Sequence, residues 1–182
     1  RINPNNHALD GGPPTSQMEK EVVADLAGML GLPDTSLGHL TGGGTVANLE
    51  ALWVARELHP DKRLAVAETA HYTHGRMSDV LNTEVVPVSA DAHGRMDLHS
   101  LDRTLEQHDI GTVVLTAGTT GLGAVDPIDE AIPLCDAHGV RVHVDAAYGG
   151  FFRLLALDEA PDIEGFPAER FRAIEEADSV AI

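Results

Sequence analysis

Short apolar runs alternate with longer amphipathic stretches along most of the 182 residues. Four runs are almost continuously apolar over the length of a buried β-strand, at 63–68, 84–89, 112–118 and 141–146. The stretches between them repeat apolar residues at helical spacing, at 45–58, 73–82, 97–108 and 127–138. This alternation predicts an α/β domain with a mainly parallel sheet flanked by helices.

The N-terminal part of the chain divides into an irregular segment and a helix. Residues 1–15 are rich in Asn, Pro and Gly, which predicts irregular structure. Ser16 is followed three positions later by Glu19, a capping box that predicts a helix from Ser16 to the terminator Gly31. We therefore expect an N-terminal segment over 1–15 and one domain over 16–182.

Two further capping residues and the last residues complete this outline. Asp97 is a candidate cap for the helix that follows it, and Pro127 stands in the first turn of the next helix. Residues 169–182 predict a helix and then the start of another strand. Because the sheet would be left with an open edge there, we expect the natural chain to continue past Ile182.

Charge and composition narrow the range of partners. The 29 acidic residues exceed the 12 basic residues by 17, so nucleic acid and anionic membrane are not expected as partners. Local backbone donors must hold any anionic ligand against this negative charge. The single cysteine, Cys135, fits a reducing cytoplasm, and no apolar stretch is long enough to span a membrane.

The first candidate for ligand binding is the glycine-rich turn before the helix at 45–58. Gly42, Gly43 and Gly44 free the backbone to turn tightly, and Thr45 begins a helix whose N–H groups point outward. The turn has neither the lysine of a P-loop nor the GxGxxG spacing. By itself the stretch is either an anion site or an ordinary glycine turn before a helix.

Asp145 ends the strand at 141–146, at the edge where ligands of open α/β sheets gather. Three roles are open to its carboxylate: metal ligand together with His143, helix cap, or partner of a buried cation. The cation explains more, because an opposite charge keeps a heterocyclic nitrogen protonated. Ala147 is small enough for a flat ring to lie on it.

Two histidines compete for a role at the same edge. His71 follows the strand at 63–68 and is a candidate for ring stacking or proton transfer, although a lone histidine is more often structural. His74 lies one helical turn later and is the competing choice.

A threonine-containing loop follows the strand at 112–118. Thr119 and Thr120 supply hydroxyl groups at the edge of the sheet, whereas Asp126 is expected to cap the next helix. A phosphate loop, a ring-stacking histidine, a hydroxyl loop and a ring-nitrogen carboxylate together describe a pocket for pyridoxal 5'-phosphate (PLP).

These stretches resemble the group II pyridoxal-phosphate decarboxylases, which include aromatic amino acid, glutamate and diaminobutyrate decarboxylases. The matching segments are "TGGGTVANLEAL", "AHYTHGRMSDVL", "TAGTTGLGAVDPI" and "HVDAAYGG", in the family's order and spacing. They are similar to its phosphate loop, stacking-histidine segment, threonine loop and pyridinium-binding strand. The resemblance covers nearly the whole chain and implies that 16–182 is part of the large PLP-binding domain of a fold type I enzyme.

The resemblance also implies roles for individual residues. Cofactor contacts are implied for Gly43, Gly44, Thr45, His71, Thr120, Asp145 and Ala147. In this interpretation Gly44 and Thr45 bind the phosphate, and Thr120 lies near the phenolic side of the ring. His71 stacks on the ring opposite Ala147, and Asp145 pairs with the ring nitrogen, so His71 and Asp145 are the expected catalytic residues. Substrate contacts are implied around residues 5–7.

The family's Schiff-base lysine follows a strand that resembles "ADSVAI", which ends this sequence at Ile182. The lysines present are Lys20 and Lys62, in the first helix and in a loop, and neither is placed to reach the ring. We therefore expect the lysine and a small C-terminal domain to lie beyond Ile182.

The expected activity is the decarboxylation of an L-amino acid to the amine and CO2, in a cytoplasmic homodimer without a metal. Another fold type I enzyme, such as sphingosine-phosphate lyase or a cysteine desulfurase, is the alternative, although the threonine loop favours the decarboxylase. A truncated, non-catalytic homologue is a third hypothesis. The sequence does not identify which amino acid is the substrate.

Overall fold

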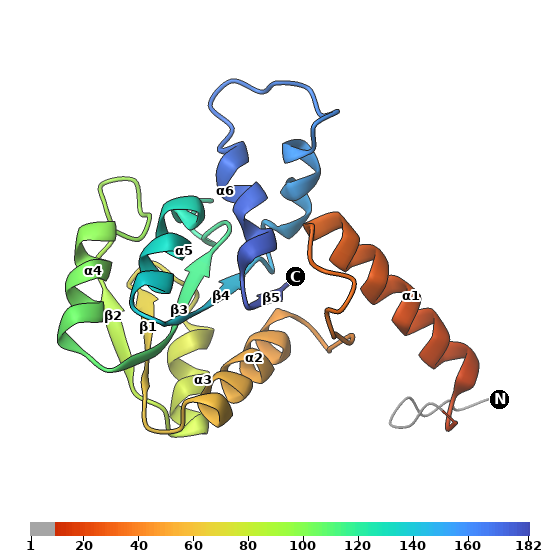
Figure 1. The fold of residues 1–182 in the computed structure, drawn as a ribbon, viewed down its shortest axis with the longest axis horizontal. Helices are drawn as coiled ribbons and strands as arrows, with labels where there is room; N and C mark the ends of the chain where they lie inside the picture. The colour runs from red at the N-terminus through yellow and green to blue at the C-terminus, as the bar shows by residue number, and fades with distance from the viewer. Residues whose placement is uncertain (1–9) are drawn as a thin grey trace.

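The computed structural model describes residues 10–182, which form a sheet with helices on both faces (Figure 1). The predicted substrate contacts at Asn5, Asn6 and His7 lie outside the described residues. The strands are all parallel and stand in the order β2-β1-β3-β4-β5. Their bounds are β1 Arg63–Ala67, β2 Val85–Val88, β3 Ile110–Thr116, β4 Arg141–Asp145 and β5 Ser179–Ala181. The predicted parallel α/β fold is confirmed.

Helices connect and cover the strands. Their bounds are α1 Pro13–Leu30, α2 Gly44–Leu58, α3 Thr73–Leu81, α4 Leu98–Gln107, α5 Ile128–Ala137 and α6 Ala168–Arg172, with the 3-10 helices η1 Gly150–Ala156 and η2 Ala173–Glu176. Every helix and strand expected from the sequence is present, with shifted ends. Within residues 10–182, no helix combines the length and apolar character needed to cross a bilayer.

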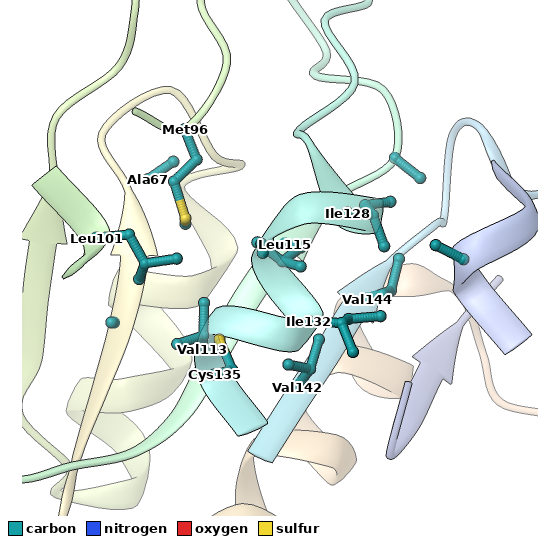
Figure 2. Close-up of a cluster of buried hydrophobic side chains, with 14 of the residues drawn as sticks. Ala67, Met96, Leu101, Val113, Leu115, Ile128, Ile132, Cys135, Val142 and Val144 are labelled. Carbon is teal, nitrogen blue, oxygen red and sulfur yellow. The ribbon is translucent and has the colours of Figure 1, made fainter. Parts of the chain in front are cut away.

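Apolar side chains of the central strands face α5. Val113 and Leu115 of β3, with Val142 and Val144 of β4, lie under this helix, and Ile132 packs on them (Figure 2). The same cluster includes buried side chains of α4 and α6. Because burying one aliphatic side chain contributes about 1.5–3 kcal/mol, this face supplies much of the stability of the sheet.

The alternate residues of the same strands face α2 and α3. Val114 of β3 packs with Leu52 of α2 and Leu81 of α3 in a second cluster. Successive side chains of a strand point to opposite faces, so His143 and Asp145 of β4 project toward this side. The apolar face of β4 therefore anchors the strand, while its other face carries ionisable groups.

The first helix begins at Pro13 rather than at Ser16. Gly12 is the N-cap, and the N–H of Ser16 donates to the Gly12 carbonyl over 2.9 Å, so Ser16 lies within the first turn. A proline suits the first position, where an N–H would have no helical partner. The predicted capping box is therefore wrong, whereas the terminator Gly31 is confirmed by its left-handed φ of 79°.

Asp97 caps α4 as predicted, because its carboxylate accepts the N–H of Ser100 over 2.7 Å. The expectation for Asp126 is wrong. Its side chain is fully buried and accepts the N–H groups of Met96 over 2.6 Å and Thr116 over 2.7 Å. Burial raises the pKa of Asp126 to about 6 against the effect of these donors. Asp126 thus joins the end of β3 to the loop before α4, and Pro127 is the N-cap of α5.

The end of β3 passes very close to the segment that follows Asp145. Strand β3 stops at Thr116, two residues before the predicted end at Gly118, where the backbone has a φ of 111° that favours glycine. A Cβ atom added to Gly149 would lie 1.7 Å from the carbonyl oxygen of Ala117. Gly149, four residues after Asp145, must therefore lack a side chain for the two segments to approach this closely.

We predict that Gly149→Ala destabilises the protein by about 3 kcal/mol or more, because the clash involves backbone that cannot move aside. Gly75→Ala is the matched control, since Gly75 lies in α3 and has no atom within 4 Å of its added Cβ. The control should be stabilised by up to about 1 kcal/mol. Urea unfolding of both variants measures the difference, and equal stabilities would contradict the close approach.

We also predict that Asp126→Ala leaves two buried N–H groups without acceptors, at a cost of about 1–3 kcal/mol each. Hydrogen exchange at Met96 and Thr116 should accelerate along with the loss of stability. The exposed Glu106→Ala in α4 is the control and should change neither quantity. Unchanged exchange at both amides would show that Asp126 does not join these segments.

Candidate functional site

A cavity of about 260 Å³ opens at the carboxyl edge of the sheet. It is lined by Gly44, Thr45, Asn48, His71, Thr73, Thr116, Gly118, Thr120, Asp145, Ala147 and Tyr148. All the predicted cofactor contacts except Gly43 lie in this lining. Gly43 faces a neighbouring, more apolar hollow between α1 and β5. A larger open hollow of about 490 Å³ beside α4 contains none of the predicted site residues.

The glycine turn places a helix start at the cavity wall. Gly43 is the N-cap of α2, with a φ of 137°, a conformation that favours glycine. The amides of Gly44 and Thr45 belong to the first helical positions, which have no partner within the helix and carry the positive end of its dipole. A Cβ added to Gly44 would lie 2.8 Å from the Cβ of Ala147, so this turn touches the segment after Asp145.

Asp145 is the acidic group of the cavity, and its side chain is only 8% exposed. One carboxylate oxygen, Oδ2, lies 2.9 Å from Nε2 of His74, and the other, Oδ1, accepts the N–H of Ala147 over 3.2 Å. Burial acts to raise the pKa of Asp145, but hydrogen bonds from His74, Ala147 and Asn48 lower it below its ordinary value. The buried carboxylate is therefore ionised at neutral pH.

His143 belongs to a structural hydrogen-bond network rather than to a metal site. Its Nε2 lies 2.9 Å from Oδ1 of Asn48, and its Nδ1 lies 3.0 Å from the hydroxyl of Ser179. Burial lowers the pKa of His143 to about 4, so the ring is neutral. Among residues 10–182, no three His, Cys, Asp or Glu side chains are close enough to hold a metal ion. The Nδ2 of Asn48 donates to the Gly44 carbonyl over 2.8 Å, which ties this network to the glycine turn.

His71 and His74 occupy different environments. His71 is half-buried in the cavity lining; its Nδ1 accepts the N–H of Thr73 over 3.3 Å, and its ring centroid lies 4.2 Å from that of Tyr72. His74 is 1% exposed, lies outside the lining and contacts the Asp145 carboxylate. Of the two, His71 is the one that can meet a ligand.

The threonine loop divides its hydroxyl groups between structure and cavity. The Oγ1 of Thr119 accepts the N–H of Ala124 over 3.0 Å, which closes the loop, whereas Thr120 is exposed and lines the cavity. Thr116 also lines the cavity beside Asp145, its partner in the β3–β4 register. Its buried Oγ1 has no hydrogen-bond partner within the described part of the chain.

Sequence reasoning missed several groups in the lining. They are Asn48, Thr73, Thr116, Gly118 and Tyr148. Strand alternation gave a usable signal for one of them, because Thr116 stands two residues after the inward-facing Val114 and so shares its face. The others reach the cavity through helix starts and turns, whose orientation is not encoded in a local spacing.

The donor set suits one kind of ligand. Outward amides at a helix start suit a phosphate, the half-buried imidazole of His71 in the cavity lining suits stacking on a flat ring, and an ionised carboxylate suits a protonated ring nitrogen. PLP carries all three features, and the unpaired Thr116 hydroxyl adds a donor beside the carboxylate. The residues present therefore fit this cofactor.

Comparison with known proteins agrees with that chemistry. Residues 1–182 match the pyridoxal-dependent decarboxylase conserved domain. A probable L-tyrosine/L-aspartate decarboxylase of Methanothrix thermoacetophila is 36% identical over 141 residues, which cover 76% of this chain and 36% of that protein. The L-2,4-diaminobutyrate decarboxylase of Rhizobium meliloti is 37% identical over 165 residues, which cover 82% of this chain and 33% of that protein.

Solved structures share the fold. The crystal structure of mouse CSAD in apo form aligns with a TM-score of 0.84 and 29% identity, covering 98% of this chain and 40% of that one. A sphingosine-1-phosphate lyase of Burkholderia pseudomallei aligns with a TM-score of 0.77 at 22% identity, covering 88% of this chain and 39% of that one, a likeness of fold alone. The chain thus spans less than half the length of these relatives. Because the family match extends over residues 1–182, the chain belongs to the pyridoxal-dependent decarboxylases, whose cofactor is PLP.

Proposed function

We propose that the full-length protein decarboxylates an L-amino acid to the corresponding amine and CO2. The observation that carries the proposal is one cavity lined both by the buried, ionised Asp145 and by the Gly44–Thr45 helix start. When bound, PLP supplies an electron sink for the pair left by departing CO2. The protein must then hold the ring nitrogen protonated and orient the reacting bond.

Individual residues have distinct parts in this proposal. Gly44 and Thr45 hold the phosphate through the start of α2, against the overall negative charge of the chain, and Gly43 supports this contact as the N-cap of the helix. His71 covers the ring face opposite Ala147 and limits the access of water. The positions of Gly44, Thr45, His71 and Ala147 in the cavity lining support these parts.

Two further groups act on the polar edge of the ring. Thr120 lies near the phenolic side, and its exposed position in the lining supports that part. Asp145 accepts a hydrogen bond from the protonated ring nitrogen and stabilises the positive charge of the ring. In this proposal Asp145 and His71 are the catalytic residues of the described chain.

We extend the proposal to the setting of the enzyme. Residues 16–182 form part of its large PLP-binding domain, preceded by the N-terminal segment 1–15. The complete enzyme is a cytoplasmic homodimer that serves amino acid metabolism. The side chains of Tyr72 and Tyr148 are 64% and 66% exposed, and Tyr148 belongs to the cavity lining. Exposed aromatic side chains at this place support a subunit interface near the cavity mouth. The single, buried Cys135 is in keeping with a reducing compartment.

The names of the relatives indicate the chemical class of the substrate. Relatives are named for decarboxylation of tyrosine, aspartate or diaminobutyrate, so an L-amino acid with a polar or aromatic side chain is the proposed substrate. A panel of amino acids assayed for CO2 release identifies it. Release of an aldehyde by carbon–carbon cleavage, or of sulfide from cysteine, would instead favour the alternative lyase or desulfurase activity.

We predict that Asp145→Ala lowers the decarboxylation rate by at least about 100-fold, because the ring nitrogen loses the charge that keeps it protonated. Circular dichroism should show an intact fold. The exposed Asp136→Ala in α5 is the control and should retain the wild-type rate. Turnover near the wild-type rate in Asp145→Ala would refute the assigned role.

We predict that Thr45→Ala weakens PLP binding by about tenfold, the loss expected for one hydrogen bond to a charged group. Fluorescence titration of the apoenzyme measures the dissociation constant. Pyridoxal, which has no phosphate, is the matched ligand and should bind both variants equally. An unchanged dissociation constant for PLP would contradict the phosphate assignment.

A further inference from the structure

His74 is a buried histidine that meets the site without lining it. It is the second residue of α3, and its Nε2 lies 2.9 Å from Oδ2 of Asp145, 71 positions later in the chain. Backbone hydrogen bonds fix its place: its N–H donates to the His71 carbonyl over 3.1 Å, and its carbonyl accepts the Ser78 hydroxyl over 2.7 Å. The imidazole is therefore held rigidly against the carboxylate.

The surroundings of the imidazole determine which nitrogen carries the proton. Its Nδ1 is buried and has no hydrogen-bond partner among residues 10–182. A proton on Nδ1 would leave an unpaired N–H in the protein interior, which is costly. We therefore place the proton on Nε2, so that His74 donates its hydrogen bond to Asp145.

Besides His74, Asp145 receives hydrogen bonds from Asn48 and from the Ala147 amide. The neighbouring His143 is already engaged with Asn48 and Ser179. The Ala147 amide reaches the other oxygen, Oδ1, at the longer distance of 3.2 Å. Of these donors, His74 makes the largest contribution to keeping the pKa of the carboxylate low.

A carboxylate and a ring nitrogen that share a hydrogen bond compete for one proton, and the stronger base takes it. A hydrogen-bond donor to the carboxylate, such as His74, stabilises the anion and makes it the weaker base. We propose that His74 is a positioning residue that holds Asp145 as an oriented anion, so that the proton stays on the cofactor's ring nitrogen. This inference rests on the proposed pairing of Asp145 with that nitrogen.

The test uses the full-length enzyme loaded with PLP labelled with ¹⁵N in the ring, because the ¹⁵N chemical shift reports ring protonation directly. In the wild type the ring should stay protonated from pH 6 to 9. In His74→Leu its proton affinity should fall by about tenfold or more, the value of a hydrogen bond to a charged group. His74→Gln restores an N–H donor and should restore the shift, and the rate constant kcat should follow the protonated fraction while KM changes little.

Controls separate this inference from the proposed function and from simple misfolding. The exposed His99→Leu in α4 makes the same chemical change away from the site and should leave the shift unaltered. An unprotonated ring in the wild type would overturn the proposed function itself. A protonated ring in folded His74→Leu, with the wild-type pH dependence, would overturn only the role of His74.

A second measurement needs no variant and no cofactor, so it holds even where His74→Leu fails to fold. The side-chain ¹⁵N spectrum of the histidine-labelled apoenzyme identifies the tautomer of His74. The proton should lie on Nε2 across neutral pH. A proton found on Nδ1 with Nε2 bare would exclude donation to Asp145 and overturn the inference.

Discussion

A carboxylate shielded from water stays ionised only where hydrogen-bond donors replace the lost solvent, and Asp145 draws such donors from separate parts of the chain. His74 comes from α3, Asn48 from the helix that begins at the glycine turn, and the Ala147 amide from the segment after β4. Of these donors, only Ala147 is close to Asp145 in the sequence. The donors that keep this buried carboxylate ionised are therefore brought together only in the folded protein, and the chemistry of the cavity depends on them.

The sheet meets this requirement by giving β4 two unlike faces. Val142 and Val144 are locked under α5, and this packing fixes the strand along its length (Figure 2). His143 and Asp145 are then presented on the opposite face, where α2 and α3 supply partners rather than apolar cover. Close passage of Gly149 along Ala117 keeps the next segment against the sheet edge. Stability and site geometry thus arise from alternate residues of one strand.

Sequence patterns were sufficient for the order of elements and for the cavity's main residues, since apolar runs and turns are local features. Asp97 as a cap and Gly31 as a terminator were predictable for the same reason. Asp126 was not, because its carboxylate binds an amide 30 positions away. His74 was seen only as a rival to His71, and its contact with Asp145 depends on how α3 docks beside β4. Such contacts follow from tertiary packing, which residue spacing does not contain.

The central claim is that a single cofactor molecule spans the distance from the start of α2 to the carboxylate at the end of β4. A crystal structure of the full-length protein with PLP bound tests this most directly. We expect the phosphate at the amides of Gly44 and Thr45 and the ring nitrogen within hydrogen-bond distance of Asp145. A cofactor bound with its ring nitrogen turned away from Asp145, or held outside this cavity, would contradict the account.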